Sequence, residues 1–209
     1  STEPEMVRAD EHAKQVQASA WSRVEREQAP ALGQVAHLEK LRAEKLRKEQ
    51  SEQRLHFLTE SFIKMARLEQ QMIQIKKTTD ALADTIFSAV LLVQKTAEEK
   101  QMEVEVTGAE ETKVWHDGNW LGEAVYNLLD NSVKYAPEHS KIRVVVRQDE
   151  MYTRIVVSDD GIGIPEGEEN RIFQRFYRGK NAGENNFGIG LSLSRQVLAQ
   201  QNGTVQAEN

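Results

Sequence analysis

The chain has 209 residues, a formal net charge of −6 at pH 7 and no cysteine. This length suffices for one or two domains with a hydrophobic core. The lack of cysteine excludes disulfide bonds and thiolate metal sites. The negative charge, without a free block of Lys and Arg, argues against a nucleic-acid-binding protein. No apolar run approaches the roughly 20 residues that cross a bilayer, so we expect a soluble polypeptide.

The N-terminal third predicts two long helices. Glu5–Gln28 contains neither proline nor glycine and is rich in helix-forming residues, whereas Pro30 and Gly33 interrupt the pattern. A second helix is expected from about Ala31 to about Ile75. Its apolar stripe has near-heptad spacing and consists of Leu55, Leu58, Phe62, Met65, Leu68 and Met72. Each apolar face is too narrow for a lone helix, which indicates a hairpin that dimerises into a four-helix bundle. The alternative is a monomeric hairpin packed on the C-terminal domain.

The composition changes near residues 74–79, and we place the domain boundary there, giving a helical domain 1–76 and a second domain 77–209. The second domain has alternating apolar patterns typical of strands and amphipathic patterns typical of helices. The expected elements are helices at Asp80–Lys100, Glu123–Tyr135 and Leu191–Gln201, and strands at Met102–Val106, Lys113–Trp115, Ile142–Arg147, Thr153–Ser158 and Thr204–Ala207. They do not alternate strictly, which favours an α+β sandwich with helices on one face of a mixed sheet. The chain stops soon after the last strand begins, so we expect a C-terminal truncation.

The helix at Glu123–Tyr135 carries an unusual polar face. Its polar residues recur at intervals of four, four and three, which places them along one side: Glu123, Asn127, Asn131 and Lys134. Carboxamide and carboxylate oxygens suit Mg²⁺, and a lysine ammonium suits phosphate oxygens. The alternative is an ordinary solvated face of an amphipathic helix.

Two glycine-bearing stretches follow. In the first, a strand ends at Ser158 and leads to Asp159, Gly161 and Gly163, where backbone and carboxylate can approach a flat ligand closely. The carboxylate can accept a hydrogen bond from an exocyclic amine such as that of adenine. Taken alone, the pattern fits a turn equally well. The second stretch, Phe187–Leu191, precedes the last helix, whose N-terminus can receive phosphates. It is neither a Walker A loop nor a dinucleotide fingerprint.

Between the two stretches lies Arg171–Arg178, followed by the polar, glycine-bearing segment Gly179–Asn186. Phe173 and Phe176 of Arg171–Arg178 suggest an anchor for a mobile lid. Each of them fits an ordinary core position equally well.

These segments, in this order, resemble the ATP-binding domain of sensor histidine kinases, a nucleotide fold of the GHKL type. NLLDNSVKY is similar to the family's N box, DDGIGIP to its G1 box, IFQRFYR to its F box and FGIGL to its G2 box. The resemblance covers about Asp80 to Asn209, with Ser192 where the family often has a third G2 glycine. It implies ATP and Mg²⁺ as cofactors and a set of site residues. These are Glu123 as a catalytic residue, Asn127 for Mg²⁺, Asn131 and Lys134 for the phosphates, Tyr135 and Asp159 for adenine, Gly161 and Gly163 for the adenine pocket, and Gly188, Gly190 and Leu191 for the phosphate loop.

Upstream, LHFLTESFIKMARLE resembles the second helix of the family's dimerisation and phosphotransfer hairpin, but no stretch matches the H box of the first helix. His12 lies at about the distance expected for the phosphoacceptor. Its neighbours differ from the family pattern, because Ala13, Val16 and Gln17 stand where an acid, Thr or Asn, and Pro are expected. An ordinary exposed helix residue is the alternative. The other histidines are His37 and His56 on the second helix, and His116 and His139 in expected loops.

The resemblance implies a sensor histidine kinase core that transfers the γ-phosphoryl group of ATP to a histidine and then to a response-regulator aspartate. The expected partners are a second copy of the chain and a receiver domain. We expect no nucleic acid, and a membrane only through a sensor region outside this chain, which would be the cytoplasmic portion of an inner-membrane sensor. The alternatives are an ATP-binding scaffold or pseudokinase without a competent acceptor, and a GHKL ATPase or serine kinase. Because the H box is unmatched, we expect good ATP binding and poor self-phosphorylation.

Overall fold

The computed structural model describes residues 37–70, 72, 74–179 and 187–209. It consists of two compact units, Ser1–His56 and Phe57–Asn209. The expected first helix, its break at Pro30–Gly33 and the candidate acceptor His12 lie outside the described residues.

A long helix occupies residues 37–69. It ends before Ile75, so the expected continuation to that residue is wrong. The reason lies in the local sequence, because Ile75 and the two threonines Thr78 and Thr79 are β-branched and favour an extended backbone. Residues 74–77 form no regular element and lead into the first strand.

The strands of the second unit form two small sheets. β1 (Thr78–Ala81) pairs antiparallel with β3 (Lys113–His116). β2 (Glu103–Thr107) pairs parallel with β4 (Lys141–Gln148), which pairs antiparallel with β5 (Thr153–Ser158). The second sheet is therefore mixed, as expected.

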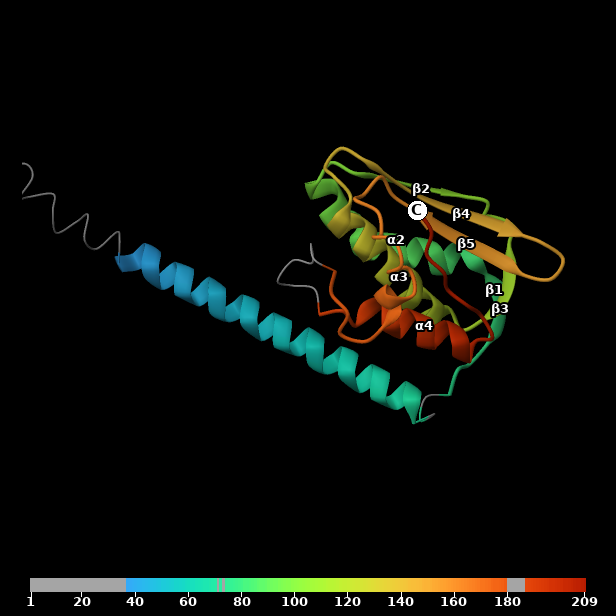
Figure 1. The fold of residues 1–209 in the computed structure, drawn as a ribbon, viewed down its shortest axis with the longest axis horizontal. Coiled ribbons are helices and arrows are strands. Elements are labelled where there is room, and N and C mark those ends of the chain that lie inside the picture. The colour runs from blue at the N-terminus through green and yellow to red at the C-terminus, as the bar shows by residue number, and fades with distance from the viewer. Residues whose placement is uncertain (1–36, 71, 73, 180–186) are drawn as a thin grey trace, which may run out of the picture. The chain divides into compact units, whose positions relative to one another are not determined.

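Three helices lie on one side of the β2-β4-β5 sheet (Figure 1): α2 (Leu82–Glu99), α3 (Gly118–Tyr135) and α4 (Gly190–Gln200). The core forms where the apolar faces of α2 and α3 meet the inward residues of β4, of which Ile142 and Val144 are fully buried. From α3, Leu129 enters the same core. Leu193 and Val197 of α4 pack in a second cluster with Ala124 of α3. A short 3-10 turn, η1 (Arg171–Phe173), precedes the segment that leads to α4. The α+β class with helices on one face of a mixed sheet is confirmed.

The structure corrects three details of this unit. The strand β1 was not expected, because its four residues are too few to show a periodic pattern. Thr204–Ala207 alternates like a strand but forms no ladder within the described residues, and a strand requires a partner for its backbone groups. His116 lies at the end of β3 rather than in a loop. It is buried, and its Nε2 is 2.8 Å from the hydroxyl of Thr85.

Candidate nucleotide-binding site

The helix α3 carries the polar face that the sequence singled out. Asp117 caps its N-terminus by accepting hydrogen bonds from the backbone N–H groups of Asn119 and Trp120, each at 3.2 Å. The helix begins at Gly118, five residues earlier than the expected start at Glu123. One face of α3 packs into the core, so the position of its polar side chains is fixed by that packing.

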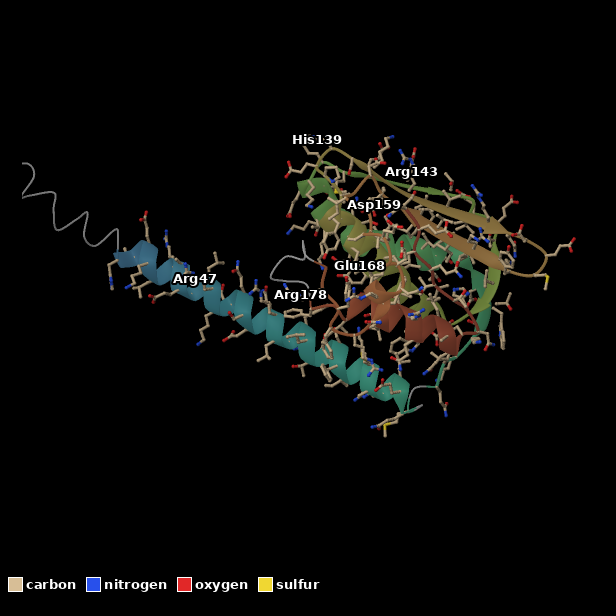
Figure 2. The ribbon with its side chains drawn as sticks, viewed as in Figure 1. Arg47, His139, Arg143, Asp159, Glu168 and Arg178 are labelled. Atoms are coloured by element: carbon tan, nitrogen blue, oxygen red, sulfur yellow. The ribbon has the colours of Figure 1, made fainter. Side chains whose placement is uncertain are left out.

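The adenine end of the site joins α3 to the loop after β5. Asp159 follows β5 and is exposed (Figure 2). Its Oδ2 accepts a hydrogen bond from the hydroxyl of Ser132 at 2.6 Å, and its Oδ1 accepts one from the backbone N–H of Gly161 at 2.9 Å. A Cβ on Gly161 would lie 2.6 Å from Oδ1 of Asp159 and 3.2 Å from the carbonyl oxygen of Tyr135. A side chain at position 161 would displace the carboxylate of Asp159, so the absence of a Cβ allows the close approach of Tyr135, Asp159 and Gly161.

Gly163 lies farther along the same loop and has a φ of +69°, which favours glycine. Its near neighbour is Asn209 rather than α3. The side-chain amide of Asn209 accepts from the backbone N–H of Ile164 and donates to its carbonyl, both at 2.7 Å. Gly163 therefore shapes the loop but lies apart from the hydrogen bonds that Asp159 accepts from Ser132 and Gly161.

At the phosphate end, Asn127 of α3 meets Gly190 at the start of α4. Asn127 is 6% exposed, and a Cβ on Gly190 would lie 2.9 Å from its Oδ1. No partner within the described residues bonds to the buried Nδ2 of Asn127. Such orphaned buried groups are rare in native structures. Because the two ends of a carboxamide exchange by a half-turn, Asn127 can present either its oxygen or its nitrogen to a ligand.

The glycine stretch before α4 is tied to the segment after η1. Gly188 has a φ of +66°, and its carbonyl accepts a hydrogen bond from the backbone N–H of Phe176 at 2.9 Å. Leu191, in the first turn of α4, is half-buried. The neighbouring Ser192 is buried and donates to the carbonyl of Ile189 at 2.8 Å, so its hydroxyl is satisfied where the family often has glycine.

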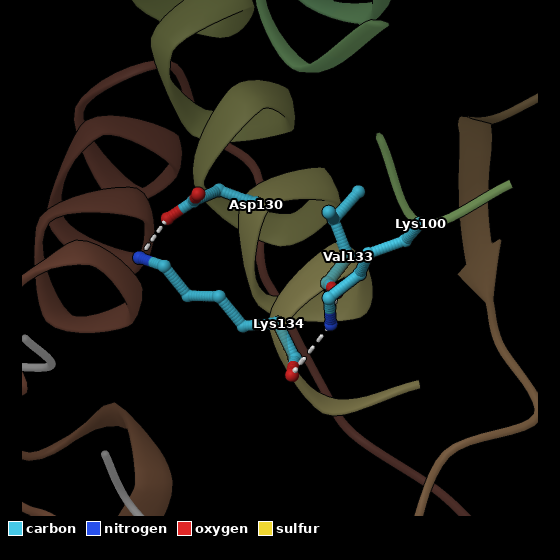
Figure 3. Close-up of polar contacts among 4 residues, drawn as sticks. All are labelled: Lys100, Asp130, Val133 and Lys134. Atoms are coloured by element: carbon cyan, nitrogen blue, oxygen red, sulfur yellow. Dashed lines mark hydrogen bonds and ion pairs between the residues drawn. The ribbon is translucent and has the colours of Figure 1, made fainter. Parts of the chain in front are cut away.

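Lys134 does not stand free on α3. Its ammonium forms an ion pair with Asp130, one turn earlier (Figure 3). The same figure shows Lys100 beside the C-terminal turn of α3, where it donates to the carbonyl of Val133 at 2.7 Å. Asp130 was not among the expected site residues, although its position four residues before a lysine on a helix predicts such a pair. Asn131 is half-buried on the same helix.

Residues 57–69 of the long helix belong to the same compact unit and contact the site's borders. Oε1 of Glu123 lies 2.8 Å from Nζ of Lys64, with the two side chains 29% and 40% exposed. Phe62 stacks on Phe176 with ring centroids 5.7 Å apart. Met65, 4% exposed, lies in the same region.

The two phenylalanines of the segment 171–178 therefore differ. Phe173 is a core residue, 5% exposed, with the guanidinium of Arg195 over its ring at 5.3 Å. Phe176 is 54% exposed and has a positive φ. Most of the expected lid, residues 180–186, lies outside the described residues.

One tyrosine reports the electrostatics of α3. Burial raises the pKa of Tyr126 above its usual value of 10.0, and the carboxylates of Asp130 and Glu123 raise it further. The polar face of α3 is therefore acidic near these two residues.

The described histidines do not cluster at the site. His37 and His56 lie on the long helix, and both are exposed. His139 occupies a turn with a φ of 62° (Figure 2). His116 is buried beside Thr85.

The chain is similar to known proteins in sequence and in fold. The profile of the family described as histidine kinase-, DNA gyrase B-, and HSP90-like ATPase matches residues 116–209. The signal transduction histidine-protein kinase/phosphatase MprB of Mycolicibacterium smegmatis is 36% identical over 129 residues, which cover 61% of this chain and 26% of that protein. A solved structure of the mycobacterial sensor histidine kinase MprB is 28% identical and matches with a TM-score of 0.53, over 64% of this chain and 84% of that one. The histidine kinase ThkA, in complex with the response regulator TrrA, matches in fold with a TM-score of 0.59 and 19% identity, over 74% of this chain and 45% of that one.

The matched profile contains the N box, the G1 loop and the G2 stretch that the structure joins around α3. It is the profile of an ATP-binding domain. The chain spans 26% of the length of the M. smegmatis relative, and no helix among the described residues is long and apolar enough to cross a membrane. Residues 116–209 thus carry a domain of the histidine kinase-, DNA gyrase B-, and HSP90-like ATPase family, and the chain is similar to the catalytic portion of bacterial sensor histidine kinases.

Proposed function

We propose that this chain binds ATP with Mg²⁺ and transfers the γ-phosphoryl group to a histidine, from which it passes to an aspartate of a response regulator. In the first transfer the bond from the γ-phosphorus to the bridging oxygen breaks, a bond to an imidazole nitrogen forms, and ADP leaves. The observation that carries the proposal is that N box, G1 and G2 residues, far apart in sequence, meet at α3. The similarity to histidine kinases supports the reaction class.

The adenine end supports ATP rather than another nucleotide. Asp159 is exposed and offers a carboxylate whose oxygens each accept one hydrogen bond within the protein. An ionised carboxylate only accepts hydrogen bonds, and each oxygen has two acceptor positions. One position therefore remains on each oxygen for the 6-amino group of adenine.

The phosphate end fits Mg²⁺ through Asn127. Its buried amide nitrogen has no partner within the described residues, and a half-turn of the carboxamide would present there an oxygen of the kind that Mg²⁺ prefers. No cluster of three or more His, Cys, Asp or Glu side chains that could hold a metal occurs in the described part of the chain, so the phosphates would supply further ligands. Bound Mg²⁺ would neutralise charge on the phosphates. The proposed phosphate contacts are Asn131, Lys134, Gly188, Gly190 and Leu191. Lys134 would leave its ion pair with Asp130 to bind phosphate.

The kinase reaction requires an acceptor histidine. An acceptor imidazole needs a neighbour that orients or takes its other proton, and His12 has no matching acidic neighbour at position 13. We therefore propose slow self-phosphorylation. The experiment is incubation with γ-labelled ATP and Mg²⁺, followed by acid and base treatment and by mass spectrometry. Phosphohistidine is lost in acid and survives base, and slow labelling of His12 is the expected result. Rapid, near-stoichiometric phosphate on His12 would contradict the weak-acceptor view, and phosphate on His37 or His56 would show another acceptor.

The same labelling experiment distinguishes two alternative functions. An ATP-binding scaffold without an acceptor is favoured by the unmatched H box, and it would bind ATP without any label. A GHKL ATPase would release phosphate without label, and a serine kinase would give a label that survives acid. Glu123 would then matter for hydrolysis, although it pairs with Lys64 in this structure.

We further propose a homodimer through domain 1–76, with the boundary to the ATP-binding domain 77–209 in the irregular residues that precede β1. Four leucines of the long helix are between 47% and 65% exposed: Leu38, Leu41, Leu46 and Leu55. Met65, expected on the dimer face, is instead covered within its own unit, so it is unsuitable for the test. Leu55→Glu should give monomers by light scattering, and Lys48→Glu, an exposed control, should not. A monomeric wild type at tens of micromolar would contradict the dimer.

The partner and the location follow the same reasoning. The ThkA complex supports a receiver domain as the partner of this chain. We propose that the whole protein is a membrane sensor whose cytoplasmic portion includes this chain. A pull-down of the purified chain with receiver domains, with and without ATP, tests the first point.

A further inference from the structure

The side chain of Ser132 is placed to control the residue that binds the base. Ser132 lies on α3, directly after Asn131, and is 5% exposed. Its hydroxyl donates to Oδ2 of Asp159 at 2.6 Å. This distance is typical of a hydroxyl bonded to an ionised carboxylate, which is stronger than a bond between neutral groups. The contact joins the buried helix to an exposed loop residue 27 positions later.

The second oxygen of Asp159 is held independently. Its Oδ1 accepts the backbone N–H of Gly161 at 2.9 Å. Two donors from two elements, one on each oxygen, fix both the position and the plane of the carboxylate. The N–H of Gly161 belongs to the same loop as Asp159, whereas the hydroxyl of Ser132 ties the carboxylate to the rigid helix. We propose that Ser132 is a positioning residue, which aims Asp159 at the 6-amino group of adenine and thereby contributes to the choice of base. This inference rests on the proposed binding of ATP through Asp159.

The energetic reason is preorganisation. A carboxylate on an exposed loop samples several rotamers, and binding an amine then requires it to adopt one of them. A hydroxyl donor that already selects the rotamer removes this cost from the binding step. Loss of the hydroxyl should therefore weaken only those ligands that use the carboxylate. Ligands without the 6-amino group should bind Ser132→Ala and wild type alike.

The test compares two nucleotides on two variants by calorimetry in the presence of Mg²⁺. ATP carries the 6-amino group, and purine riboside triphosphate lacks it. Ser132→Ala should bind ATP about five- to tenfold more weakly than wild type does, the effect expected of one lost hydrogen bond. Its affinity for purine riboside triphosphate should equal that of wild type. Ser132→Cys, which keeps a weak donor of similar size, should fall between wild type and Ser132→Ala for ATP.

Thr85→Val is the matched control. It removes another buried hydroxyl, which lies 2.8 Å from Nε2 of His116. Thr85 packs beside Gly118, which is 14 residues from Ser132 on α3 and hence about 21 Å away along the helix axis. Thr85→Val should lower stability without changing the preference for ATP over purine riboside triphosphate.

The outcomes separate this inference from the proposed function. If wild type binds ATP, and Ser132→Ala binds both nucleotides as wild type does, the positioning role is overturned while ATP binding stands. Equal weakening of both nucleotides in Ser132→Ala would mean a general structural effect and would also overturn it. No binding of ATP by folded wild type would overturn the proposed function itself.

Discussion

The adenine end and the phosphate end of the site differ in how their polar groups are paired. At the adenine end, both oxygens of Asp159 have donors, from Ser132 and from Gly161. At the phosphate end, Nδ2 of the buried Asn127 has no partner in the described chain, and Lys134 is engaged by Asp130. A neutral base offers only weak hydrogen-bonding groups, so its acceptor must be fixed in advance if it is to select among bases. Phosphates bring charge, and this charge can compete for side chains that are unpaired or paired with an exposed neighbour.

The substitution Asp159→Asn should cause the largest loss of ATP affinity. An amide in place of the carboxylate presents an NH₂ group to one of the donors that now hold Asp159, or to the 6-amino group itself. We expect ATP binding to weaken about 30-fold or more, corresponding to about 2 kcal/mol. Calorimetric titration with ATP and Mg²⁺ measures the change.

The neighbouring Asp160 provides the matched control for Asp159→Asn. Its Oδ1 lies 3.6 Å from a guanidinium nitrogen of Arg143, labelled in Figure 2, and its side chain is 55% exposed. An exposed ion pair contributes little, so Asp160→Asn should leave ATP affinity almost unchanged. Similar losses in both variants would point to the net charge of the loop rather than to the acceptor.

At the phosphate end, Asn127→Ala should remove the dependence of binding on Mg²⁺. We expect ATP affinity with Mg²⁺ to fall on the order of tenfold or more, the scale on which changes around metal sites act. Affinity with EDTA should change little. Because the lost amide has an unsatisfied nitrogen, the free energy of unfolding should change by less than about 1 kcal/mol. Asn119→Ala, at an exposed position of the same helix, is the control. An undiminished effect of Mg²⁺ in Asn127→Ala would show that the metal is held elsewhere.

The substitution Asp130→Asn should strengthen ATP binding at the phosphate end. It releases Lys134 from its ion pair and removes a negative charge near the proposed phosphate position. Since exposed pairs contribute up to about 1 kcal/mol, affinity for ATP should rise up to about fivefold. The gain should disappear in the double variant with Lys134→Met. Weaker binding by Asp130→Asn would mean that Asp130 holds Lys134 in a productive position instead.

The smallest effect concerns pH. Burial first, and then the carboxylates of Asp130 and Glu123, raise the pKa of Tyr126 in the folded chain above 10.0. The folded chain therefore keeps this proton to a higher pH than the unfolded chain does. The stabilisation is fully present below pH 10 and is lost as the pH rises through the folded-state pKa. Urea unfolding should show a steeper loss of stability above pH 10 for wild type than for Tyr126→Phe. Parallel curves would contradict a pKa of Tyr126 raised by burial and by the two carboxylates.

The sequence predicted the adenine end better than the phosphate end. Asp159, Gly161 and Tyr135 occur in short motifs whose spacing constrains them, and the structure brings them together. The bond from Ser132 could not be predicted, because it depends on how α3 packs against the loop after β5. The orphaned amide of Asn127 likewise depends on the approach of Gly190, 63 residues later in the chain. Helix spacing alone could have predicted the pair of Asp130 with Lys134.

The fold shows the same division between local and long-range information. The strand Thr153–Ser158 was predicted with its observed bounds because its alternation is regular. β1 forms because it pairs with β3, and Thr204–Ala207 forms no ladder within the described residues. Local propensity predicts neither the pairing of β1 nor the missing partner of Thr204–Ala207. The end of the long helix before Ile75 reflects β-branched residues that outweighed a continuing apolar stripe.

The central claim is that Asp159 is a fixed acceptor for the amine of adenine. Competition between ATP and GTP on the wild-type chain, with Mg²⁺ present, tests it most directly, because guanine carries a carbonyl oxygen where adenine carries the amine. A carboxylate facing that oxygen loses a hydrogen bond and meets another acceptor, at a cost on the order of 2 kcal/mol or more. ATP should therefore bind at least about 30-fold more tightly than GTP. Equal affinity for the two nucleotides would contradict it.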